Sequence, residues 1–126
     1  MSTALLCLAT AIYFEARGEN LMGQRAVAQV VINRVEDPRY PDTVCGVVWE
    51  PKQLSFTHDG KPEKMYEAEA RETAMQVAEE ALQGNGLNIT STHYHSTGVK
   101  PYWRTAFNLD GRVDNHYFYT NETPYK

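Results

Sequence analysis

The sequence predicts an α+β domain that is mainly helical and carries a small β element beside its helices. Apolar residues recur at helical spacing in several segments of the first two thirds of the chain. The last third changes character, because eight of the fourteen aromatic residues lie between Tyr94 and Tyr125, interleaved with polar residues. A length of 126 residues fits one domain, so we expect residues 1–126 to form a single unit.

Two amphipathic helices are expected at the N-terminus. The first contains the apolar run from Leu5 to Phe14 and ends near Gly18, and the second starts after the N-cap Asn20 and ends at Asp37-Pro38. The apolar run has no basic residues before it, no cleavage-like site after it and too few residues to span a bilayer. We therefore expect a buried helix, with no recognisable export signal and no stable membrane anchoring.

The remaining elements are shorter, with one exception. We expect a third short helix over 43–49, a short strand in the first half of 53–60, and a clear helix over 65–82 with an apolar stripe of alanine, valine and leucine. Two strands are expected near Thr92–Ser96 and Val113–Tyr119.

The net charge of −4 has one location. Residues 62–82 hold six acidic and two basic residues, which accounts for the whole excess of four, and we interpret this acidity as the solvated face of a helix. An acidic chain is not built to neutralise nucleic-acid phosphates or anionic lipid. The only cysteines, Cys7 and Cys45, belong to no CxxC motif, so a cysteine-based zinc site is disfavoured.

Glu15 is the sharpest single candidate for catalysis. It lies in the last turn of the first helix, after Tyr13 and Phe14, where the helix dipole and partial burial both favour a protonated carboxyl, the form that a general acid needs. By position alone, an ordinary glutamate paired with Arg17 or Arg25 is the stronger interpretation.

Several polar residues are candidates for supporting roles. Glu19 precedes the second helix and is expected to fix the loop near Glu15, whereas Gln24 could face either solvent or a cleft. His93, His95 and His116 could together hold a metal ion, but we favour a hydrogen-bonding role for them and predict no metal site.

The C-terminal aromatic residues have two interpretations. They could form the core of the β element, or some could line a groove that stacks on sugars, with polar neighbours supplying hydrogen bonds. Stacking also serves single-stranded nucleic acid, but this region has little surplus positive charge, so we expect no nucleic-acid partner. The residues in question are Tyr94, Tyr102, Trp103, Tyr117 and Tyr119, with Gln53, Ser55, Asn115 and His116 as neighbours.

Several blocks of the chain, read in order, resemble one family. They are YFEARGE at 13–19, GQRAVAQVVINRV at 23–35, YPDTVCGVV at 40–48, QLSFTHDG at 53–60, YHS at 94–96, VKPYW at 99–103 and NHYFY at 115–119. Together they resemble the SleB/CwlJ family of cell-wall hydrolases from about residue 5 to residue 119. Phe56 stands where the family commonly has tryptophan, and Ser96 where it commonly has alanine.

The resemblance implies a lysozyme-like, lytic-transglycosylase-like core that cleaves peptidoglycan between N-acetylmuramic acid and N-acetylglucosamine without a cofactor. Glu15 matches the family's catalytic glutamate, acting first as acid and then as base, and the product would carry a 1,6-anhydro-muramoyl end. The supporting or substrate-binding candidates are Glu19, Gln24, Gln53, Ser55, Phe56, Asp59, Tyr94, Trp103, Asn115 and His116.

Three alternatives stay open at this point. A hydrolytic muramidase would need a second carboxylate roughly 5–10 Å away, for which Asp59 is the best candidate and Glu19 the next. A metal-dependent amidase would use the three histidines His93, His95 and His116, and a non-catalytic module would bind glycans through the aromatic groove.

The resemblance also bears on oxidation state and location. Cys7 and Cys45 match cysteine-bearing positions of the family, which implies a disulfide between them outside the reducing cytoplasm. A bare catalytic domain with no export signal and no wall-binding segment is typical of a phage endolysin. We therefore expect a monomer made in the host cytoplasm that acts on the cell wall after release.

Overall fold

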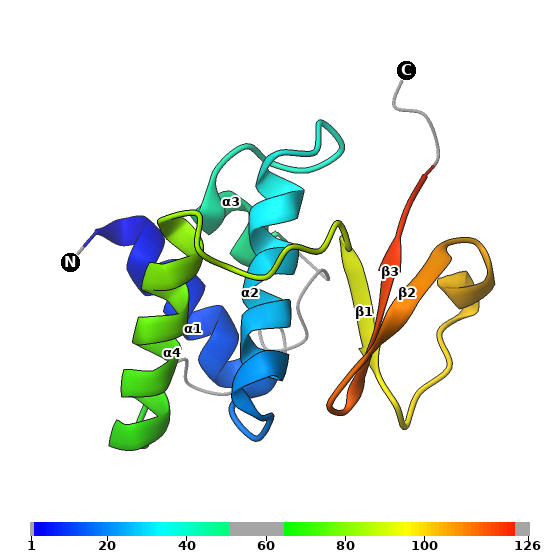
Figure 1. Cartoon of the computed structure of the whole chain (residues 1–126). Helices are drawn as coiled ribbons and strands as arrows, with labels where there is room; N and C mark the ends of the chain where they lie inside the picture. Colours follow the sequence, from blue (N-terminus) through cyan, green and yellow to red (C-terminus); the bar gives the residue numbers. More distant parts are fainter. Residues whose placement is uncertain (1, 51–64, 123–126) are drawn as a thin grey trace.

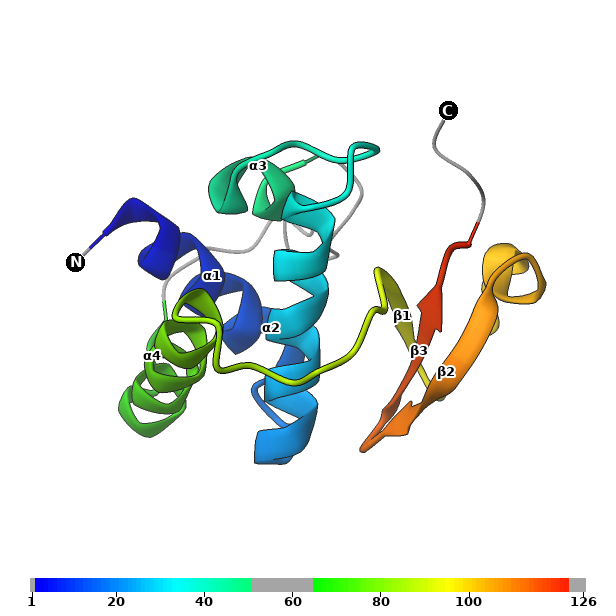
Figure 2. The same ribbon diagram turned by 45° about the horizontal axis from the view of Figure 1, so that its top comes forward.

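The computed structural model describes residues 2–50 and 65–122. Among these residues the helices are α1 (Thr3–Ala16), α2 (Leu21–Val35), α3 (Val44–Val48) and α4 (Ala68–Leu82). They precede strand β1 (His93–Ser96), the 3-10 helix η2 (Tyr102–Thr105), and strands β2 (Asn108–Val113) and β3 (His116–Thr120). The helices gather on one side and the sheet on the other, with α2 between the other helices and the sheet (Figures 1 and 2). The predicted α+β class is confirmed.

Short polar side chains cap the starts of the first three helices. Ser2 Oγ accepts a hydrogen bond from the Leu5 amide at 3.1 Å, and Asn20 Oδ1 accepts one from Gly23 at 2.8 Å. Thr43 Oγ1 accepts one from the Gly46 amide at 3.0 Å. Each cap satisfies a backbone N–H that has no partner inside its helix. The predicted N-cap at Asn20 and the short third helix are thus confirmed.

The main apolar core lies among the four helices. Helix α1 packs against α2, α3 and α4, and its Leu8 and Ile12 side chains are fully buried. Val47 of α3 and Ala78 of α4 belong to the same cluster. The disulfide between Cys7 and Cys45, the pair that the resemblance implies, joins α1 to α3 with the two Cα atoms 5.3 Å apart. This part is held by apolar burial and by one covalent link.

Helix α4 begins three residues later than the sequence predicts, at Ala68 instead of Met65. The preceding segment instead contacts α1, because the Glu67 amide donates a hydrogen bond to Tyr13 Oη at 2.9 Å. Two of the acidic residues of this region also form ion pairs with other elements. Arg17 pairs with Glu67 at 2.7 Å and Arg25 with Glu80 at 3.3 Å, so the acidic face is not wholly solvated, and both arginines have partners other than Glu15.

The sheet is antiparallel, with strand order β1-β3-β2. The strand predicted near Val113–Tyr119 is confirmed over 116–119, as part of β3. Its start is wrong, since Val113 ends β2 and a turn at Asp114, whose φ is 50°, separates the two strands. Strand β2 was not expected from the sequence. The structure accommodates Gly111, with a φ of 153°, at an irregularity in the pairing with β3.

A second, smaller apolar cluster joins α2 to the sheet. Val27 and Val30 of α2 are buried with Phe118 of β3, on the side of α2 that faces away from the main core. The connection from α4 to β1 runs alongside α2 (Figures 1 and 2) and is fastened there by Asn33, whose side-chain amide donates to Ile89 O and Ser91 O at 2.9 Å. None of the helices in the described segments is both long and apolar enough to cross a bilayer.

Candidate active site

A pocket of about 410 Å³ lies where the helical part meets the sheet. Its walls come from the end of α1, the inner face of α2, strand β1 with the residues after it, and the start of β3. The described residues that line it are Phe14, Glu15, Arg34, Tyr94, His95, Ser96, Val99 and His116. Glu15, Tyr94 and His116 of the sequence candidates are therefore brought to one pocket.

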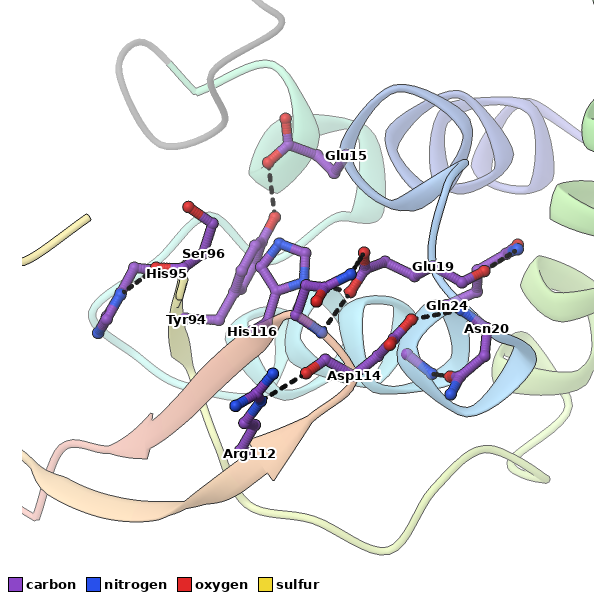
Figure 3. Close-up of polar contacts among 12 residues, drawn as sticks. Glu15, Glu19, Asn20, Gln24, Tyr94, His95, Ser96, Arg112, Asp114 and His116 are labelled. Atoms are coloured by element: carbon purple, nitrogen blue, oxygen red, sulfur yellow. Dashed lines mark hydrogen bonds and ion pairs between the residues drawn. The ribbon is translucent and has the colours of Figure 1, made fainter. Parts of the chain in front are cut away.

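Tyr94 holds the Glu15 carboxyl group in place. Its phenol donates a hydrogen bond to Glu15 Oε1 at 2.7 Å, across 79 positions of sequence (Figure 3). Burial, and then the neighbouring charge of Glu15, raise the pKa of Tyr94 well above its usual value, so the phenol stays protonated and acts as the donor.

Glu19 fastens the β2–β3 turn to the loop between α1 and α2. Its Oε1 accepts hydrogen bonds from the Asn115 amide at 2.9 Å and from His116 Nδ1 at 3.0 Å, and its Oε2 accepts one from Asn115 Nδ2 at 3.1 Å (Figure 3). Desolvation acts to raise the pKa of Glu19, but the hydrogen bonds from Asn115 and the contact with His116 outweigh it, so the pKa is lowered.

Two further contacts hold the same loop. Asp114 Oδ2 accepts a hydrogen bond from the Asn20 amide at 2.7 Å, and Gln24, which is buried, donates from Nε2 to the Glu19 carbonyl oxygen at 3.3 Å. Gln24 and Asn115 thus take part in building the site through Glu19, and the structure places neither of them among the residues that line the pocket.

Arg34 is a pocket residue that sequence reasoning did not select. Arg34 is only 4% exposed, its Nε donates to the Thr92 carbonyl oxygen at 2.8 Å, and its buried Nη1 has no hydrogen-bond partner among the described residues. A signal was present in the sequence, because Arg34 continues the inward-facing spacing of Val27, Val30 and Val31 on α2. A cation at the end of an apolar stripe indicates a buried polar environment.

Trp103 lies on the other face of the sheet. Its ring contacts His93, His95 and Tyr119, with ring centroids 5.2 to 5.7 Å apart. It therefore packs in an aromatic cluster of the sheet, and the expected role of Trp103 in the groove receives no support from its position. Tyr102, next to it, is 91% exposed.

The three histidines of the sheet are also divided between its faces. The register pairs His93 with Tyr119 and His95 with Tyr117, whereas His116 pairs with Ser96 and shares its face with Tyr94. In Figure 3 the rings of His95 and His116 point away from each other. Within the two described segments no group of three metal-ligating side chains is present. One metal ion could not reach all three histidines without rebuilding the sheet.

Four of the predicted site residues, Gln53, Ser55, Phe56 and Asp59, lie outside the described residues. Their roles stay predictions, as does the expected strand within 53–60.

Comparison with protein families gives one match over most of the chain. A family model described as Cell Wall Hydrolase matches residues 18–119. The match begins three positions after Glu15 and includes all the other residues that line the pocket except Phe14.

Curated relatives carry the name spore cortex-lytic enzyme. The protein from Bacillus subtilis (strain 168) is 40% identical over 113 residues, which are 88% of this chain and 35% of that protein. The protein from Halalkalibacterium halodurans is 40% identical over 87 residues, which are 69% of this chain and 25% of that protein. The chain thus spans about a third or less of the length of these relatives.

Two solved structures share the fold. The catalytic domain of the germination-specific lytic transglycosylase SleB from Bacillus anthracis superposes with a TM-score of 0.81 at 30% identity, covering 95% of this chain and 97% of that one. The catalytic domain of the Bacillus cereus SleB protein gives 0.79 at 29% identity, covering 93% and 89%.

Proposed function

The chain belongs to the cell wall hydrolase family, and from this premise we propose that it cleaves the glycan strands of peptidoglycan as a lytic transglycosylase, with Glu15 as the catalytic residue. The observation that carries the proposal is the Glu15 carboxyl in the pocket, with Oε1 held by Tyr94 at 2.7 Å. The names of the relatives and of the solved SleB domains support it. Residues 1–126 would act as one catalytic domain on the cell wall.

The proposed reaction needs one carboxyl group that works twice. The protonated Glu15 carboxyl group gives its proton to the oxygen between N-acetylmuramic acid and N-acetylglucosamine, and the bond from that oxygen to C1 of the muramoyl unit breaks. The carboxylate then takes the proton from the C6 hydroxyl as O6 bonds to C1. The products are a 1,6-anhydro-muramoyl end and a free C4 hydroxyl on the N-acetylglucosamine, and no water is consumed.

The role of Tyr94 follows from the same geometry. Because the phenol stays protonated, it donates to Oε1 in both states of the Glu15 carboxyl group and keeps the group in one orientation through the proton transfers. This contact also stabilises the carboxylate that exists between the two steps.

Hydrolysis remains the second candidate. It would need another carboxylate, and Glu19 fits this role poorly because both of its oxygens accept hydrogen bonds from Asn115 and His116. Asp59 remains a prediction for that role. The chemical identity of the product ends separates the two reactions.

The test of the proposed catalytic residue uses purified sacculi. Glu15→Gln should lower the rate of sacculus clearing by about 10²–10⁴-fold, the usual effect of removing a general acid, with an unchanged melting temperature. The matched control is Glu79→Gln, which changes an exposed glutamate of α4 and should leave the rate unchanged. Wild-type clearing by Glu15→Gln would contradict the proposal, and binding of sacculi without cleavage by the wild type would favour a glycan-binding module. Clearing that persists in EDTA would remove the metal-dependent amidase.

A further inference from the structure

His116 connects the residues that build the site with the pocket itself. Its Nδ1 lies 3.0 Å from Glu19 Oε1, while the same residue lines the pocket that contains Glu15. Figure 3 shows the ring between Glu19 on one side and the Tyr94–Glu15 pair on the other. With Nδ1 engaged by Glu19, Nε2 is the second polar atom of the ring.

Glu19 determines where the ring carries its hydrogen. An ionised carboxylate can only accept hydrogen bonds, and the two bonds from Asn115 stabilise the ionised form of Glu19. His116 Nδ1 is therefore the donor in this contact, and in the neutral ring Nε2 has a lone pair and accepts. The contact thus selects one tautomer as well as one orientation.

The ring lies close to the proposed reacting groups. It makes an edge contact with Tyr94, with ring centroids 5.2 Å apart, and the Tyr94 phenol contacts Glu15. His116 and Glu15 are thus separated by a single side chain along the wall of one pocket.

Resting on the proposed function, we propose that His116 Nε2 accepts a hydrogen bond from a hydroxyl group of the saccharide unit bound beside Glu15. His116 is then a substrate-binding residue, and Glu19 is the positioning residue that fixes its tautomer. A neutral saccharide with many hydroxyl donors suits an acceptor of this kind. In this arrangement His116 supplies a hydrogen-bond acceptor to the pocket, and Glu15 supplies the proposed acid.

Two substitutions of His116 distinguish the role of Nδ1 from the role of Nε2. His116→Asn places an amide N–H at the position of Nδ1, so it keeps the contact with Glu19 and removes Nε2. His116→Gln places its amide near Nε2 and gives up the contact with Glu19. Kinetics with soluble glycan fragments should show that His116→Asn keeps the wild-type melting temperature but loses about 10–100-fold in kcat/KM, mostly through KM.

The matched variant should behave in the opposite way. His116→Gln should lower the melting temperature and retain more of kcat/KM than His116→Asn does. A role limited to structure predicts that His116→Asn has wild-type kcat/KM, and that result would overturn the proposal.

A binding measurement tests His116 without turnover. In the Glu15→Gln variant, long-range ¹H–¹⁵N spectra should show the Nδ1–H tautomer of His116, and N-acetylglucosamine oligomers should shift Nε2. An Nε2–H tautomer, or an Nε2 signal that saturating oligomer leaves unchanged, would overturn the proposal. Failure of the proposed catalytic function would appear elsewhere, as a wild-type enzyme that leaves sacculi uncleaved.

Discussion

The helical part of the molecule and its junction with the sheet are held together by different kinds of contact. The helices share a large apolar core and a disulfide between Cys7 and Cys45. The junction has a smaller apolar cluster, together with polar side chains such as Glu19 and Asn33 that form hydrogen bonds with the neighbouring segment. Apolar burial gives the stable scaffold, whereas directional hydrogen bonds set the positions of the two walls of the pocket.

This difference has a consequence for catalysis. Glu15 belongs to the scaffold, at the end of α1, but its partner Tyr94 belongs to the sheet. The geometry of the proposed acid therefore depends on how the sheet packs against the helices. Perturbing each region separately should move stability and activity independently.

Removal of the disulfide should have the largest effect on stability. The bond closes a loop with a sequence separation of 38, for which chain-entropy estimates give about 4 kcal/mol. We expect Cys7→Ser/Cys45→Ser to lose about 2–4 kcal/mol in denaturant unfolding, while the activity of the molecules that remain folded is close to wild type. Unchanged stability in this variant, or loss of activity in the folded molecules, would contradict the view that the helical part and the junction can be perturbed separately.

Glu19→Gln should have the next largest effect, and it should act at the junction. The substitution removes an ionised acceptor from Asn115 and His116, and we expect about 2–3 kcal/mol of local destabilisation. Hydrogen exchange should accelerate at the amides of the β2–β3 turn but not in α1 or α4, and activity should fall with it. Glu80→Gln breaks the exposed pair with Arg25 and serves as the control, with an effect below about 1 kcal/mol.

Acid should weaken the junction before it weakens the helices. Burial, together with Arg34 and Arg39, lowers the pKa of His93 from 6.5 to about 4, so the unfolded chain binds a proton in this window and the folded one does not. Stability should therefore fall as the pH drops from about 6.5 to 4, by on the order of 2 kcal/mol after allowance for solvent screening.

The location of this effect can be checked. All the histidines in the described residues, His93, His95 and His116, lie in the sheet. In His93→Gln, chemical denaturation at pH 6.5 and pH 5 should show a smaller difference than in the wild type. The lowered pKa of Glu19 adds a further loss only below about pH 4.5. An unchanged pH dependence in His93→Gln would show that another group is responsible.

The smallest effect should come from Tyr94→Phe. It removes the hydrogen bond to Glu15 Oε1 but keeps the ring, and we expect kcat to fall about 5–30-fold, equivalent to about 1–2 kcal/mol. The control is Tyr13→Phe in the helical part, because Tyr13 Oη accepts from Arg17 and from the Glu67 amide. Tyr13→Phe should lower the melting temperature and leave kcat unchanged. A larger loss of kcat in Tyr13→Phe than in Tyr94→Phe would reverse the comparison.

The difference between the helical part and the sheet also explains which elements could be predicted from the sequence. Helices α1, α2 and α3 follow from apolar spacing, caps and stop signals, all of which are local. The β2–β3 hairpin does not, because Asp110-Gly111 is typical of a turn and only pairing with β3 makes it a strand. Local signals therefore describe the scaffold well and the sheet poorly.

At the candidate active site, too, local sequence patterns reveal single residues but not the contacts between distant ones. Glu15 could be selected by its place at the end of an apolar helix and by its match to a family motif. Its contact with Tyr94 joins residues 79 positions apart, and the hydrogen bonds that Glu19 accepts from Asn115 and His116 join residues 96 and 97 positions apart. Spacing carries no information on such contacts. The burial of Arg34 could have been predicted from the sequence, because Arg34 continues the inward-facing apolar stripe of α2.

The proposed transglycosylase mechanism depends on one carboxyl group, Glu15, which acts as both acid and base without a water molecule. Mass spectrometry of the muropeptides released from sacculi by the wild-type enzyme tests this claim. If Glu15 acts in this way, the released muropeptides should be one water lighter than hydrolytic products, and their muramoyl ends should resist reduction by borohydride. In Glu15→Gln the amount of these products should fall in parallel with the clearing of sacculi. Reducing muramoyl ends from the wild-type enzyme would contradict this mechanism.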